Sequence, residues 1–90
     1  MPLIGTPLDI ILETITGSMR EKYRLPIALG IHNEDGLLSY DILLHGEPIG
    51  HVNPEKQVVV TYKSKLPYSN EIMNELVNIL HEGGWCDYAR

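Results

Sequence analysis

Apolar side chains recur every three or four residues in two segments of the chain, one near each end. Thr6 and Pro7 are suited to begin the first helix, and Pro26 predicts its end near residues 22–24. Ser69 is suited to cap the second helix, and Gly83-Gly84 to end it. The two apolar stripes consist of Leu8, Ile11, Leu12, Ile15, Met19 and Tyr23, and of Ile72, Met73, Leu76, Val77, Ile79 and Leu80. This spacing predicts two amphipathic helices.

Between these segments the apolar period falls to two, which predicts strands with one buried face. The expected strands are separated by turns at residues 33–36, 46–47 and 54–55. Gly36 and Gly46 are the residues there that readily adopt a positive φ, and Pro54 favours a type I turn. We therefore expect four consecutive strands joined by three tight reversals.

Counting outward from these turns gives an expected register for the sheet. Ile31 would lie opposite Leu38, Ile42 opposite His51, and His51 opposite Val58. Most of the aliphatic side chains then share one face, which both helices can cover. The sequence predicts a single α+β domain over residues 1–90. It is a four-stranded antiparallel meander sheet with the N-terminal and C-terminal helices packed on one face, in the order α-β-β-β-β-α.

The same register predicts a small apolar patch on the opposite face of the sheet. Leu43, Val52 and Val59 would cluster around Gly50, with polar residues such as Asp41 at the border. An apolar centre with a polar rim is typical of a protein interface, and a glycine lets a partner approach closely. Two alternatives are an open sheet with a few exposed aliphatic residues and a face covered by the C-terminal tail.

Two aromatic residues near the C-terminus, Trp85 and Tyr88, form a second candidate binding surface. Trp and Tyr are favoured anchors at protein interfaces. The alternative for Trp85 is packing against the helices.

The charge balance is acidic, with 12 Asp and Glu against 7 Lys and Arg and a formal net charge of −5. Such a surface suits a basic protein partner or simple solubility, and it argues against a surface that follows nucleic-acid phosphates. A nucleic-acid-binding alternative would use Lys63, Lys65 and the segment 20–24. The predicted order of helices and strands is similar to that of double-stranded-RNA-binding domains. The start of the second helix, however, carries Glu71 where such a domain would be expected to have a basic residue.

The four histidines do not predict a metal site. His45 and His51 would fall on opposite faces of neighbouring strands, and His81 and Cys86 lack two further ligands nearby. A closed zinc site needs four ligands. We therefore expect no metal and no other cofactor.

No catalytic residues are predicted either. Ser39, Asp41 and His45 share one strand face, but His45 would lie roughly 13 Å from Asp41 at the usual strand rise. A catalytic triad requires hydrogen-bond contacts. The expectation is that the protein is not an enzyme.

Cys86 is the only cysteine, so an intramolecular disulfide is impossible, which suits a reducing compartment. No apolar run approaches the roughly 18–20 residues of a membrane span. We expect a cytoplasmic protein with no membrane association. The expected function is that of a small acidic non-catalytic protein-interaction module (adaptor, inhibitor or immunity-type protein). Its partner would be another protein or, in a homodimer, itself, with nucleic-acid binding as the first alternative and a small hydrolase or metal protein as the second.

Overall fold

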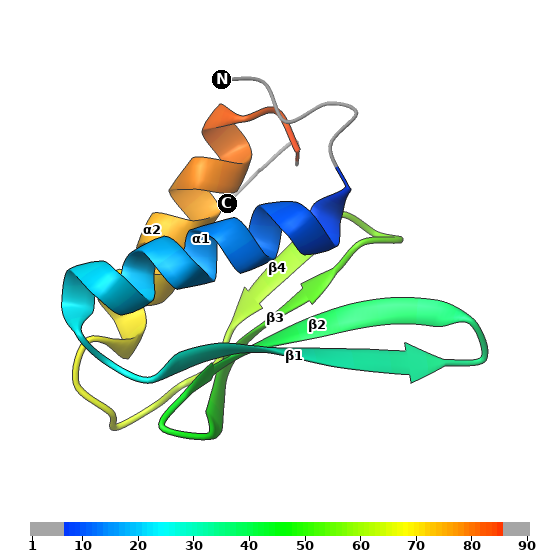
Figure 1. The fold of residues 1–90 in the computed structure, drawn as a ribbon. Helices are drawn as coiled ribbons and strands as arrows, with labels where there is room; N and C mark the ends of the chain where they lie inside the picture. The colour runs from blue at the N-terminus through cyan, green and yellow to red at the C-terminus, as the bar shows by residue number, and fades with distance from the viewer. Residues whose placement is uncertain (1–6, 86–90) are drawn as a thin grey trace.

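The computed structural model describes residues 7–85 and places two helices over one face of a four-stranded sheet (Figure 1). The elements are α1 (Leu8–Tyr23), β1 (Ile27–Glu34), β2 (Leu37–Leu44), β3 (Glu47–Asn53), β4 (Val58–Thr61) and α2 (Ser69–Glu82). The strands pair antiparallel in the order β1-β2-β3-β4. The predicted α-β-β-β-β-α arrangement is confirmed.

Helix α1 begins after Pro7, which is extended, and ends at Arg24, which is left-handed. The carbonyl of Pro7 accepts the amide of Ile11, so Pro7 occupies the N-cap position. The predicted cap Thr6 lies outside the described residues. Arg24 adopts a left-handed conformation with φ 55° and ends the helix just before the extended segment at Pro26.

Helix α2 ends at the predicted glycine pair. Gly84 has φ +79° and donates its amide to the carbonyl of His81, while the amide of Trp85 reaches back to Leu80. These two bonds form a Schellman motif, which satisfies carbonyls that the helix end would otherwise leave unpaired. The motif turns the chain so that Trp85 packs against the core.

All three turns lie at positions different from those predicted. The first two are two-residue turns, at Asp35-Gly36 and at His45-Gly46, with positive φ at both residues of each. This type I′ geometry matches the twist of the flanking strands. The third reversal spans residues 54–57. Each predicted pairing is therefore wrong by two residues near its turn, which leaves the same side chains on each face.

A β-bulge in β3 reverses the predicted faces of the last two strands. Ile42 pairs with Gly50, but Leu43 pairs with Pro48, so Ile49 is an extra residue in β3. Beyond the bulge, Gly50 and Val52 turn toward the helices and His51 turns away from them. The expected pairing of Ile42 with His51 is wrong, because one inserted residue exchanges the two faces of a strand.

The core lies between the helices and the inner face of the sheet. Leu12, Met19, Ile42, Val52 and Leu80 are among its fully buried side chains. Gly50 leaves room for the end of the Met73 side chain from α2, which would have to shift if residue 50 carried a Cβ.

The two helices are also joined at their surface. Glu75 of α2 accepts hydrogen bonds from Lys22 Nζ (2.8 Å) and from the Tyr23 hydroxyl (3.0 Å) at the end of α1. These bonds fix the end of α1 against α2. Over residues 7–85, neither helix has the length and apolar character needed to cross a membrane.

Candidate functional site

Both helices cover the same face of the sheet, so its other face, called here the outer face, carries no helix or strand from residues 7–85 (Figure 1). The register assigns alternate residues of each strand to this face. They are Ala28, Gly30, His32, Glu34, Leu37, Ser39, Asp41, Leu43, Pro48, His51, Asn53, Val58 and Val60. The outer face is therefore the candidate binding surface.

At the centre of the outer face, one carboxylate joins two imidazoles from neighbouring strands. His32 Nε2 of β1 donates to Asp41 Oδ2, and His51 Nδ1 of β3 donates to Asp41 Oδ1, both at 2.7 Å. The two imidazole rings are 6.5 Å apart between centroids. The side chain of Asp41 is only 18% exposed, while that of His32 is 51% exposed. The cluster thus has a half-buried acid and an accessible imidazole.

Three influences set the pKa of Asp41. Burial of the carboxyl raises the pKa, whereas the hydrogen bonds from His51 and His32, and the charge of these rings when protonated, lower it by more. The net result is a pKa below its ordinary value of 3.8. Asp41 is therefore a carboxylate at neutral pH.

The described residues around this cluster bring neither a hydroxyl nor a further metal ligand to it. Both imidazoles direct their hydrogen bonds to Asp41, and no hydroxyl of residues 7–85 bonds to either ring. Over the same residues, no group of three or more His, Cys, Asp and Glu is placed to hold a metal ion. The hydrogen bonds can hold the three side chains in a fixed arrangement between three strands.

Beside this cluster, β4 presents apolar side chains to solvent. Val58 and Val60 are each 43% exposed, and their register partners on the outer face are Asn53 and His51. Tyr62, directly after β4, is also exposed. The outer face thus has an apolar margin next to a polar centre.

A hollow of about 300 Å³ opens where β2 and β3 separate. These strands pair only as far as Tyr40 and Val52, so the ends of the two hairpins diverge. Two carboxylates, Glu34 and Glu55, border the hollow. The remaining lining residues are Leu37, Leu38, Ser39, His51 and Asn53.

The structure separates the residues of the predicted apolar patch. Leu43 and Asp41 lie on the outer face as predicted. The predicted placement of Gly50, Val52 and Val59 on this face is wrong, because the bulge at Ile49 turns all three toward the helices. Val52 is completely buried, Gly50 packs against Met73, and Val59 packs against the core.

Of the two aromatic residues predicted near the C-terminus, Trp85 lies partly buried against the core, and its carbonyl accepts a hydrogen bond from Gln57 Nε2 at 2.9 Å. Tyr88 lies outside the described residues, as does Cys86. A binding role for these residues stays a prediction.

Neither the Asp41 cluster nor the position of Val58 and Val60 on the outer face was predicted from the sequence. The Asp-Gly pair at residues 35–36 is a strong signal for a two-residue hairpin. Such a turn would have placed Asp41 opposite Gly30, two residues along β1 from His32. The position of the bulge had no comparable signal, so the pairing of Asp41 with His51 could not be counted from the turns.

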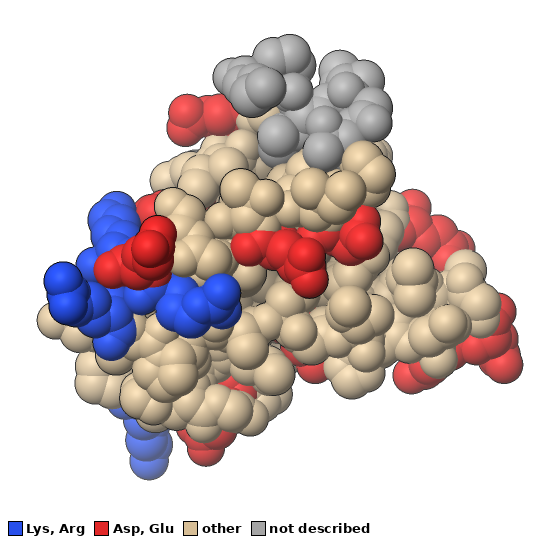
Figure 2. Space-filling model, viewed as in Figure 1, with Lys and Arg blue, Asp and Glu red and all other residues tan. Residues whose placement is uncertain are grey.

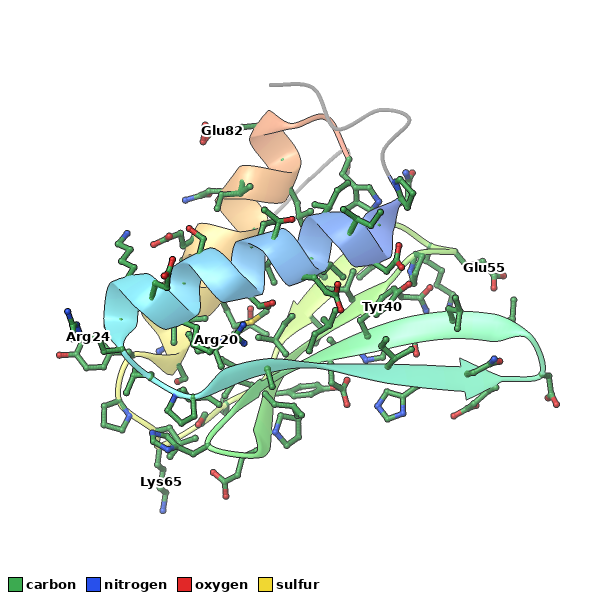
Figure 3. The ribbon with its side chains drawn as sticks, viewed as in Figure 1. Arg20, Arg24, Tyr40, Glu55, Lys65 and Glu82 are labelled. Carbon is green, nitrogen blue, oxygen red and sulfur yellow. The ribbon has the colours of Figure 1, made fainter. Side chains whose placement is uncertain are left out.

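Several basic side chains gather at one end of the molecule, where α1 ends and β1 begins (Figure 2). Arg24 and Lys65 both lie toward this end (Figure 3). Two members of this group already have partners, since Lys22 pairs with Glu75 and Arg20 Nη1 donates to the carbonyl of Ile27 at 2.6 Å. Acidic side chains gather at the opposite end, around the tip of the β1–β2 hairpin (Figure 2).

No family model matches the chain, and neither the curated proteins nor the solved structures contain a match.

Proposed function

We propose that the chain is a small acidic non-catalytic protein-interaction module, of the adaptor, inhibitor or immunity type, that binds its partner through the outer face. One observation carries this proposal. Both helices leave the outer face open, and this face combines exposed Val58 and Val60 with an adjoining hollow between Glu34 and Glu55. An apolar area beside polar groups is typical of a binding surface.

The chemistry of the outer face defines the kind of partner. Glu34 and Glu55 border the hollow, and neither Lys nor Arg is among its lining residues. A Lys or Arg of the partner would enter the hollow, and an aliphatic side chain beside it would cover Val60. The net charge of −5 favours approach of a basic protein.

The test compares three variants of the immobilised protein in capture from a lysate of the native host. Val60→Lys disturbs the apolar margin, and Glu55→Lys reverses one charge of the hollow. Ile10→Lys is the matched control, because Ile10 (51% exposed) on α1 is an aliphatic residue at least as exposed as Val60 (43%). Each partner captured by the wild type is then purified, and its affinity is measured against all four proteins.

We expect one partner that binds the wild type and Ile10→Lys equally. Val60→Lys and Glu55→Lys should each weaken it at least about tenfold, since central interface residues contribute most of the binding energy. Affinity should also fall as salt rises. A partner that binds Val60→Lys and Glu55→Lys as tightly as the wild type would contradict the proposal.

Nucleic-acid binding is a second candidate, favoured by the gathering of basic side chains at one end (Figure 2). It has less support, because Lys22 and Arg20 are already engaged within the protein. Arg24, Lys63 and Lys65 would then contact about three phosphates, giving a slope of about −3 for log affinity against log salt. An electrophoretic shift of duplex RNA and DNA at low and high salt tests this alternative, and no salt-sensitive shift would remove it.

A further inference from the structure

The outer edge of β1 offers unpaired backbone groups. The carbonyl of Pro26 accepts the amide of His45, so residues 28, 30, 32 and 34 are those that bond to β2. The residues between them direct their amides and carbonyls away from the sheet. The carbonyl of Ile27 is taken by Arg20, which leaves Leu29, Ile31 and Asn33 with donors and acceptors on the open edge.

This edge lacks the features that usually prevent strands from pairing. Protected edges are short, bulged, or carry Lys or Pro. The other edge strand, β4, has only four residues, whereas β1 has eight and contains neither Lys nor Pro nor a bulge. Ile31, at the middle of the open stretch, is 59% exposed. The edge of β1 is thus suited to pair with another strand.

The charges along β1 select an antiparallel second copy as that strand. β1 begins at the basic end of the molecule and runs to the acidic tip of the β1–β2 hairpin (Figures 1 and 2). Arg20 sits on the edge at Ile27, while Glu34 ends the strand and Asp35 follows it in the turn. Two copies in opposite directions bring the basic start of each β1 to the acidic tip of the other.

The positions of the open backbone groups fix the register. Pairing centred on Ile31 sets Ile31 against Ile31 of the second copy and Leu29 against Asn33 of the second copy. In this register, each residue with an unpaired backbone amide and carbonyl lies opposite another such residue. Continuing the count, Ile27 meets Asp35 of the second copy, which brings that carboxylate to Arg20. A hollow of about 330 Å³ beside this part of β1, lined by Glu13, Thr16, Arg20, Ala28 and Leu29, leaves room for the hairpin tip.

We propose that the chain forms a two-fold dimer in which β1 pairs antiparallel with β1 of a second copy, so that two four-stranded sheets join into one. This goes beyond the proposed function, because it uses the edge of the sheet and leaves the outer face of each copy free. Strand addition at an open edge is a common mode of protein recognition. The exposed pair at Ile31 lies on the two-fold axis.

The first test is sedimentation equilibrium of the full chain from about 10 μM to about 1 mM. We expect a monomer–dimer equilibrium for the wild type. Ile31→Lys places two like charges on the axis and should raise the dissociation constant at least about tenfold. Leu38→Lys is the matched control, since Leu38 is a similarly exposed aliphatic residue of the same hairpin on β2, and it should dimerise as the wild type does. A wild type that is monomeric throughout, or a dimer that Ile31→Lys leaves intact, would overturn the proposal.

The second test addresses the register through charge exchange. Arg20→Glu alone and Asp35→Lys alone each place like charges together twice in a homodimer, so both should dimerise more weakly than the wild type. An equimolar mixture of the two variants restores both opposite-charge contacts, and it should associate more tightly than either variant alone. A mixture that associates no better than its components would exclude this register.

Amide hydrogen exchange supplies a readout residue by residue. Gly30 and His32 bond to β2 within one copy, so their amides should be protected at every concentration. The amides of Leu29, Ile31 and Asn33 should exchange fast in dilute protein and slow down as the dimer forms. If these three amides stay fast in a dimer, β1 is not its interface.

Discussion

At the scale of single residues, Asp41 has the most consequential environment in the molecule. Its carboxylate accepts a hydrogen bond from one imidazole of each neighbouring strand, so a single side chain connects β1, β2 and β3 on the outer face. Hydrogen bonds to a charged acceptor are stronger than those between neutral groups. Asp41 therefore stabilises the arrangement of the outer face as well as contributing to its charge.

The lowered pKa of Asp41 predicts a specific pH dependence of stability. A carboxyl whose pKa is lower in the folded than in the unfolded chain adds stability above its unfolded pKa, and this stability is lost as pH falls through the folded pKa. Asp41→Asn should lower the free energy of unfolding by about 1 kcal/mol at neutral pH. The deficit relative to wild type should shrink as pH falls from about 5 to about 2. Urea unfolding over this range measures it, and a deficit independent of pH would contradict the assigned role.

At the scale of elements, two glycines should respond to the same substitution with opposite sign. Gly17 lies within α1, and a Cβ there would make only an ordinary contact of 3.6 Å with Arg20 Nη2. Gly17→Ala should raise the free energy of unfolding by about 0.5–1 kcal/mol, because alanine is the better helix former. The backbone at Gly84 has φ +79° in the Schellman motif, a conformation that favours glycine. Gly84→Ala should therefore lower the free energy of unfolding by about 1 kcal/mol. Thermal unfolding of both variants provides the check, and changes of equal sign would be inconsistent with the described end of α2.

The helices and the number and order of the strands could be predicted because their signals are local. The stripe through Ile11 and Ile15 follows from spacing alone, as does the stop at Gly83-Gly84. The turns were predicted less well, because the polar run Asn33-Glu34 resembles a turn although both residues belong to β1. These errors moved each register by two residues, so they did not change which side chains face the helices.

The bulge at Ile49 had the opposite effect on the candidate site. It is a single inserted residue, so it exchanges the faces of β3 beyond that point and of β4, which pairs with it. Val52 lies in the core and Val59 packs against it, whereas Val58 and Val60 lie on the outer face. Next to the bulge, Gly50 lies against the Met73 side chain of α2, which is a contact between distant elements. Spacing within a strand carries no information about that contact.

At the scale of the whole molecule, charge is separated along β1 (Figures 1 and 2). Exposed valines lie on the outer face, and exposed Ile31, Leu37 and Leu38 lie on the β1–β2 hairpin. The outer face and the edge of β1 are different surfaces, and of the residues assigned to them only Glu34 belongs to both. In a β1-paired dimer the outer faces of both copies lie on one side of a continuous sheet. Such a dimer would present two binding faces, and a partner with two matching sites would gain affinity through the linkage.

The orientation of β3 and β4 decides whether the proposed outer face exists. Cross-strand nuclear Overhauser effects in isotopically labelled protein measure it directly. We predict contacts between Asp41 and His51, between Tyr40 and Val52, and between His51 and Val60, together with contacts from the Val52 methyl groups to the core. Contacts that instead join Ile42 to His51 and His51 to Val58, with Val52 in water, would contradict this account.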